Sequence, residues 1–150
     1  MIKIKPFKQS KGYCGLASLK MIFSFYGINK SEKYLAEITK TTRDKGCDEI
    51  NIVKAARKFD LNGYVKQNSS LKEIKKLLKK KIPVIVNWFS PEEGGHYSVV
   101  VGFEKNKIIL IDPHFGELKK HKIEWFEERW FDLPFSPDGP VLKQIIVIHK

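Results

Sequence analysis

The chain has 150 residues, of which 42% are hydrophobic, 12% aromatic and 30% charged, and its formal net charge is +11. This length and composition are typical of one globular domain over residues 1–150 and exclude a largely disordered chain. Nearly all the positive charge is lysine, because only Arg43, Arg57 and Arg129 are arginines. Since arginine is the residue that reads bases and clamps phosphates, we expect no specific nucleic-acid partner.

No apolar run in the sequence reaches the length of a signal sequence or of a membrane-spanning helix. Two cysteines, Cys14 and Cys47, are too few for the disulfide framework of a small secreted protein. The sequence leaves a single bridge between these two cysteines open. We therefore expect a cytoplasmic protein without a membrane span.

The first half of the chain is predicted to be helical after a short edge strand over residues 1–5, where apolar residues and lysines alternate. Residues 13–26 are apolar on nearly every side, which is typical of a buried central helix. Three further helices are predicted: one capped by Ser31, one over residues 48–59, and one that begins with the capping box of Ser70 and Glu73.

The second half of the chain is predicted to form strands, because short apolar and β-branched runs alternate with turn residues. A short helix over residues 122–130 interrupts them, with its aromatic side chains turned inward. The predicted strands cover residues 83–88, 97–103, 107–111 and 144–149. Helices followed by an antiparallel sheet indicate an α+β fold.

Cys14 is the first residue with a chemical signature. A lone cysteine is usually inert packing, but Gly12 and Gly15 flank this one at the entry to the long apolar helix. A thiol in the first turn of a helix meets the positive end of the helix dipole, which favours the thiolate. Gln9, five residues upstream, is placed to donate an amide N–H to an oxyanion that develops near the sulfur.

His96 and Asp112 lie at the ends of two predicted strands that a hairpin joins. Residues 97–103 and 107–111 flank the turn at residues 104–106, so the hairpin brings His96 and Asp112 nearly opposite each other at its open end. Taken alone, His96 reads as a surface residue in a turn and Asp112 as a turn-initiating aspartate. Together they have the arrangement in which a carboxylate orients an imidazole.

These segments resemble those of a known family. The stretch from Gln9 to Ile22, QSKGYCGLASLKMI, resembles the active-site segment of the double-glycine-leader cysteine peptidases, which trim bacteriocin and peptide-pheromone leaders. The stretch GHYSVVVGF resembles their histidine strand, and ILIDP resembles their aspartate strand. The resemblance extends to about Trp130.

The resemblance implies a papain-like cysteine peptidase fold, in which N-terminal helices pack on a C-terminal antiparallel sheet. It implies that Cys14 attacks a peptide or amide bond, that His96 transfers protons, that Asp112 orients His96 and that Gln9 serves the oxyanion hole. Such an enzyme needs neither a metal nor an organic cofactor. The expected substrate is a peptide or protein, and the expected form is a stand-alone peptidase domain with a separate transporter as a conceivable partner.

Two alternatives stay open at this point. The same fold without turnover would serve as a peptide-binding module, although such a module would not need all four residue types. An acyl or peptidyl transferase would pass through the same thioester as a hydrolase, so the sequence does not separate these reactions.

Other candidate residues have weaker signatures. Cys47 is placed to line the pocket but reads as a structural thiol, and His114 lies close enough to Asp112 to touch a substrate. His121 reads as a surface or edge position. A zinc site built from Cys14, Cys47, His96 and His114 has no C-x-x-C or H-x-x-x-H spacing, so no metal is predicted.

Overall fold

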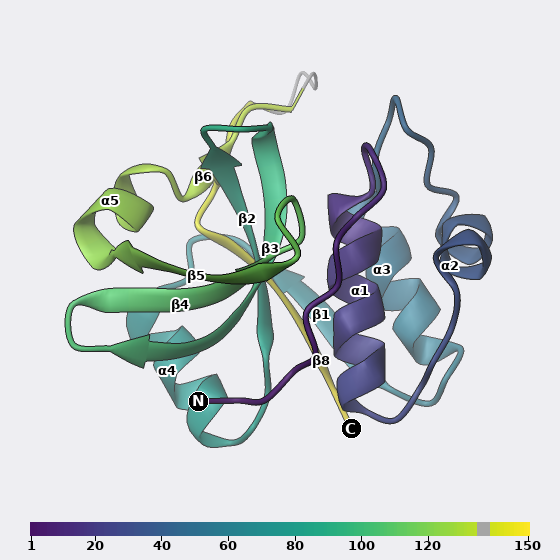
Figure 1. Cartoon of the computed structure of the whole chain (residues 1–150), viewed down its shortest axis with the longest axis horizontal. Coiled ribbons are helices and arrows are strands. Elements are labelled where there is room, and N and C mark those ends of the chain that lie inside the picture. Colours follow the sequence, from purple (N-terminus) through teal and green to yellow (C-terminus); the bar gives the residue numbers. More distant parts are fainter. Residues whose placement is uncertain (135–138) are drawn as a thin grey trace.

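The computed structural model describes residues 1–134 and 139–150 (Figure 1). The helices are α1 (Cys14–Phe25), α2 (Glu32–Thr39), α3 (Glu49–Arg57), α4 (Leu71–Lys79) and α5 (Ile123–Glu128). The strands are β1 (Asn62–Lys66), β2 (Val84–Ser90), β3 (Gly94–Glu104), β4 (Lys107–Asp112), β5 (Glu117–Lys122), β6 (Phe131–Asp132), β7 (Val141–Leu142) and β8 (Gln144–His149).

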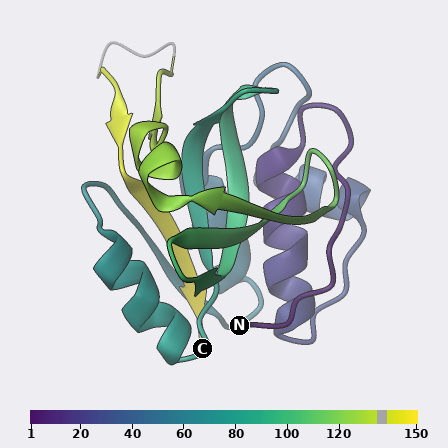
Figure 2. The same ribbon diagram turned by 60° about the vertical axis from the view of Figure 1, so that its left-hand side comes forward.

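One six-stranded sheet organises the molecule, with strand order β1-β8-β2-β3-β4-β5 and antiparallel pairing throughout. Helices α1 and α3 cover one face of this sheet, and α4 and α5 lie on the other side, as Figures 1 and 2 show. The predicted α+β fold, with N-terminal helices packed on an antiparallel sheet, is therefore confirmed.

The central strands β2, β3, β4 and β8 are mostly apolar and are buried on both faces. Val84, Val86 and Trp88 of β2 pack in the cluster that includes α4 and α5 residues, whereas Ile85 packs in the cluster with α1 and α3. Alternate side chains of one strand point to opposite faces of a sheet. A sheet covered on both sides therefore reads as a continuous apolar run rather than an alternating one.

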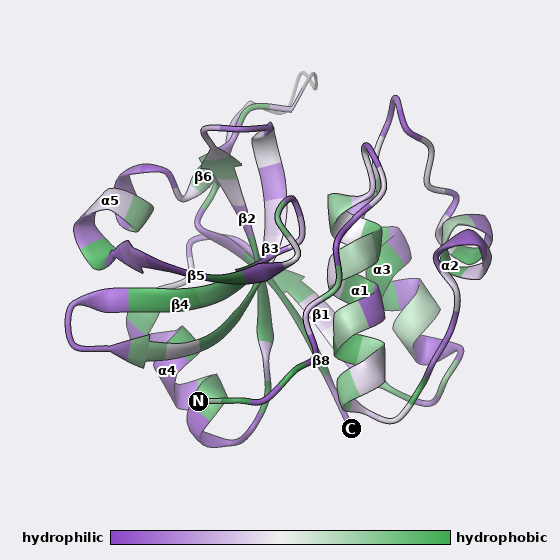
Figure 3. Ribbon diagram, in the orientation of Figure 1, coloured by the Kyte–Doolittle hydropathy of each residue, from purple (hydrophilic) through white to green (hydrophobic). Residues whose placement is uncertain are grey.

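The predicted helices and the four central strands are present with ends shifted by a few residues. Ser31 and Ser70 cap α2 and α4 as expected, because their side chains accept hydrogen bonds from the backbone N–H groups of Tyr34 and Glu73. The sequence did not predict β1 or β5. Figure 3 shows β5 as largely hydrophilic beside the apolar β4, which is typical of a sheet edge that lysines keep in solvent.

The prediction of an edge strand over residues 1–5 is wrong. Only the backbone N–H of Ile2 reaches the sheet, where it donates to the carbonyl oxygen of Val101 at 2.8 Å, and no strand is assigned in this part of the described chain. The physical reason is that β3 already pairs with β2 on one side and β4 on the other. The register of β3 with β4 shifts between Val100 and Gly102, and this irregularity is where Ile2 docks.

Candidate active site

Cys14 is the first residue of α1, at a helix end that no side chain caps. Tyr13 occupies the N-cap position, and within residues 1–134 and 139–150 its side chain makes no capping hydrogen bond. By contrast, α2, α3 and α4 all have a side-chain cap. The backbone N–H groups in the first turn of α1 therefore stay available to an anion bound beside Cys14.

Two glycines allow the Cys14 segment to approach its neighbours closely. Gly12 has a φ of +79°, and a Cβ there would lie 2.5 Å from the carbonyl oxygen of Arg43. A Cβ at Gly15 would lie 3.0 Å from both the Tyr97 ring and the Cys47 Cβ. Gly12 and Gly15 are therefore needed for close packing, because larger residues in their place would push the start of α1 away from its neighbours.

His96 and Asp112 meet in the interior, at the same end of β3 and β4. His96 Nε2 lies 2.7 Å from Asp112 Oδ1, and both side chains are almost completely buried. The same carboxylate oxygen accepts the backbone N–H of His114 at 3.0 Å, which fixes the turn after β4. Both sequence interpretations of Asp112 therefore hold structurally, since it initiates a turn and contacts the imidazole.

The charge state of His96 is set by its neighbours. Burial lowers the pKa of His96, but Asp112, Cys14 and Glu93 together outweigh burial and raise this pKa to about 11. His96 is therefore an imidazolium over the physiological range. A cationic ring beside a thiol favours the thiolate, as in other Cys–His pairs.

Gln9 is held in place by the segment that follows Asp112. Its backbone N–H donates to the carbonyl oxygen of Pro113 at 2.9 Å, and Ser10 next to it bonds the Glu32 carboxylate through both its N–H and its hydroxyl. The Gln9 side chain points its amide Nε2 toward Glu93 Oε1, 3.3 Å away. The structure thus brings Gln9 to the end of the sheet where His96 and Asp112 lie.

Glu93 is the residue of this site that the sequence analysis missed. Its Oε2 lies 3.1 Å from His96 Nδ1 and 3.3 Å from His114 Nδ1, so this carboxylate contacts three residues that were considered separately. The pKa of Glu93 is lowered, chiefly by His96, so it stays ionised. The sequence feature that could have indicated Glu93 is its position in a tight turn, three residues before His96.

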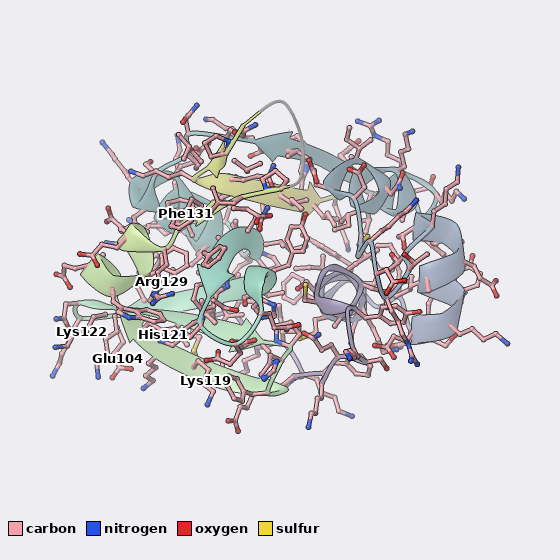
Figure 4. The ribbon with its side chains drawn as sticks, turned by 90° about the horizontal axis from the view of Figure 1, so that it is seen from above. Glu104, Lys119, His121, Lys122, Arg129 and Phe131 are labelled. Atoms are coloured by element: carbon pink, nitrogen blue, oxygen red, sulfur yellow. The ribbon has the colours of Figure 1, made fainter. Side chains whose placement is uncertain are left out.

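His121 lies on β5, the edge strand of the sheet, as expected, but its side chain is half-buried rather than fully exposed. Its ring stacks on Trp125 with centroids 4.6 Å apart, and burial lowers its pKa. Figure 4 shows His121 near Lys122 and Arg129, on the side of the molecule formed by β5 and α5. The Trp88 ring packs near both histidines, with its centroid 6.0 Å from that of His96 and 5.7 Å from that of His121.

A cleft of about 480 Å³ lies next to Cys14. Cys47 lines it, as expected, together with Gly95, Tyr97 and Asp132. The two cysteines are free thiols, so the bridge that the sequence left open is not formed. Burial raises the pKa of the Cys47 thiol, which keeps it protonated near neutral pH.

Several proteins of known name are similar in sequence to this chain. Residues 1–135 match the family described as the Peptidase_C39 like family. The chain is 34% identical over 119 residues to the transport/processing ATP-binding protein ComA of Streptococcus pneumoniae, which covers 78% of this chain and 16% of that protein. It is 36% identical over 101 residues to PedD of Pediococcus acidilactici, which covers 67% of this chain and 13% of that protein. The chain therefore spans only about one sixth to one eighth of the length of these relatives.

Solved structures share the fold. The peptidase domain of Streptococcus ComA superposes with a TM-score of 0.78 at 25% identity, with 97% of each chain covered. A double-glycine-motif protease from a transporter, solved with its leader peptide, superposes with a TM-score of 0.73 at 23% identity, with 98% of this chain and 91% of that one covered. No helix within the described residues is long and apolar enough to cross a membrane. With the family matched over residues 1–135, this chain belongs to the C39-like cysteine peptidases.

Proposed function

We propose that this cysteine peptidase cleaves a peptide bond through a thioester on Cys14, with His96 as general base and acid, Asp112 as the group that orients His96, and Gln9 as an oxyanion-hole donor. The observation that carries this assignment is the contact of 2.7 Å between His96 Nε2 and Asp112 Oδ1. That contact uses Nε2 of His96, so proton exchange with the thiol falls to Nδ1, which also lies 3.1 Å from Glu93 Oε2; the nearby thiol contributes to the raised pKa of His96. These are the roles that a Cys–His pair with an orienting third group requires.

The proposed reaction proceeds in two steps. The Cys14 thiolate adds to the substrate carbonyl, and the negative charge on its oxygen meets the Gln9 amide and the free N–H groups at the start of α1. His96 Nδ1–H then protonates the leaving amine as the peptide bond breaks and the thioester forms. Water, deprotonated by His96, hydrolyses the thioester and releases the carboxylate product and the Cys14 thiol.

The substrate in this proposal is a peptide leader, because the related proteins are named for processing and one related structure holds a leader peptide. The cleft beside Cys14 supplies the space for the chain on one side of the scissile bond. We place the reaction in the cytoplasm, where two unpaired cysteines stay reduced. A transporter is the partner that the names of the relatives suggest.

Alkylation of the two thiols tests the assignment of Cys14. Iodoacetamide at neutral pH should modify Cys14 much faster than Cys47, because the thiolate is the reactive form and burial raises the pKa of Cys47. Peptide mapping by mass spectrometry over a time course measures the two rates, and the unfolded protein serves as the control in which the two rates converge. Faster labelling of Cys47 in the folded protein would contradict the assignment.

The net charge of +11 should act on substrate capture rather than on chemistry. If the lysines attract an acidic peptide, raising the salt concentration should lower kcat/KM several-fold and leave kcat almost unchanged, because screening acts on long-range attraction. A matched peptide with neutral residues in place of the acidic ones should lose this salt dependence. A kcat that falls in parallel with kcat/KM would show that the charge acts at the reacting atoms instead.

A further inference from the structure

The Glu93 carboxylate contacts two groups that take part in the proposed reaction, the Gln9 amide and the His96 ring. One of its oxygens accepts the Gln9 Nε2–H at 3.3 Å, and the other lies 3.1 Å from His96 Nδ1 and 3.3 Å from His114 Nδ1. The backbone N–H of Glu93 donates to the Ser90 hydroxyl at 3.1 Å, so the turn between β2 and β3 presents the side chain at this place.

This arrangement conflicts with turnover. The Gln9 amide has to donate to the oxyanion of the substrate, and His96 Nδ1 has to exchange a proton with the thiol and then with the leaving amine. A fixed carboxylate at the same atoms takes both contacts and adds a negative charge beside the developing oxyanion, where like charges repel strongly in a partly buried site.

The contacts of Glu93 are also incomplete, which favours displacement. His96 Nδ1 is buried and lies 3.1 Å from Glu93 Oε2, yet it has no well-aligned hydrogen-bond partner among the described residues. Glu93 itself is partly exposed, and the preceding Glu92 is fully at the surface. A buried polar atom without a well-aligned partner becomes more stable when a ligand supplies one, so a substrate that pairs with His96 Nδ1 competes well against Glu93.

We propose that Glu93 is a further active-site residue that competes with the substrate: in the resting enzyme its carboxylate occupies the oxyanion-hole donor and the free ring nitrogen of His96, and the substrate must displace it. The acyl product of peptide cleavage ends in a carboxylate, so the Glu93 carboxylate makes the contacts that this product would make. This inference rests on the proposed roles of Gln9, Cys14 and His96.

Binding of a peptide aldehyde tests this competition. The aldehyde carbon accepts the Cys14 sulfur, and the thiol proton ends on the new hemithioacetal or on His96, so the adduct places an oxygen at the oxyanion hole without turnover. Glu93→Gln removes the charge with little change in shape, and Glu92→Gln, one residue earlier in the same turn, is the matched control. Glu93→Gln removes the contacts that the charged carboxylate makes in competition with the ligand. The aldehyde should therefore bind about tenfold more tightly, and kcat/KM should also rise. Glu92→Gln should behave as the wild type.

Unchanged or weaker aldehyde binding in Glu93→Gln would overturn the competition, and weaker binding would instead make Glu93 a residue that supports the site. Glu93→Ala separates charge from shape, because it should also bind the aldehyde at least as tightly as Glu93→Gln. Absence of an adduct in the wild type and in every variant would overturn the proposed function, and this inference with it. Thermal unfolding of each variant shows that the comparison is between folded proteins.

Discussion

Cys14→Ala should abolish peptide cleavage while the fold and the midpoint of thermal unfolding stay nearly unchanged. In the proposed reaction the sulfur forms the thioester, so its removal should lower kcat by at least about 10⁴-fold, as loss of a nucleophile does in comparable hydrolases. Cys14 is only partly buried, at the exposed end of α1, so the loss of packing should be small. Cleavage of a leader peptide, followed by mass spectrometry, measures the first effect and calorimetry the second.

Cys47→Ala is the matched control for this substitution. Cys47 is buried against α1, so its truncation should cost about 1 kcal/mol of unfolding free energy. Its turnover should stay within a few-fold of the wild type. The opposite pattern, with activity retained in Cys14→Ala and lost in Cys47→Ala, would mean that the second thiol of the cleft is the nucleophile.

His96→Ala should reduce turnover by at least about 10³-fold, because it removes the only proposed base and acid. Asp112→Asn should be the milder change, since the amide oxygen of asparagine still accepts hydrogen bonds from His96 and from the His114 backbone. A larger loss in Asp112→Asn than in His96→Ala would show that Asp112 has another role, such as holding the turn after β4.

The pH profile of Asp112→Asn follows from the pKa of His96. Burial lowers that pKa and Asp112 is the largest of the contributions that raise it to about 11, so the substitution should move the alkaline limb of kcat/KM to lower pH.

The contribution of His96 to the free energy of unfolding changes with pH in the same direction. Because the folded pKa lies above the ordinary 6.5, the stabilising contribution is complete below pH 6.5 and is lost as the pH rises toward about 11. Asp112→Asn should therefore lose stability mainly at neutral and acidic pH, which urea unfolding at several pH values measures.

Much of the fold could be predicted because its central elements carry strong local signals. The buried α1 is apolar on nearly every side, and Ser70 begins α4 with the expected cap. Strands β1 and β5 could not be predicted, because β1 begins with Asn62–Gly63, a pair typical of turns, and β5 is rich in lysine. Edge strands depend on their neighbours for pairing more than on their own composition.

The candidate site was predictable where one hairpin brings its residues together. His96 and Asp112 follow from the register of β3 with β4, even though the observed register shifts at Val100/Gly102. The spacing of Glu93 from His96 was a weak local signal, but its contact with Gln9 could not be predicted, because the two residues are 84 positions apart in the sequence. Likewise, the position of Trp88 over His96 depends on how β2 pairs with β3.

The bond between Gln9 and Glu93 joins residues 84 positions apart, and the backbone bond from Gln9 to Pro113 links even more distant segments. Contacts of such long sequence separation require closure of large loops, so they form late during folding. A nascent or partly folded chain would therefore carry the thiol before it has the histidine, the carboxylate and the amide in place. The proposed catalytic centre is therefore complete only when the whole sheet has formed.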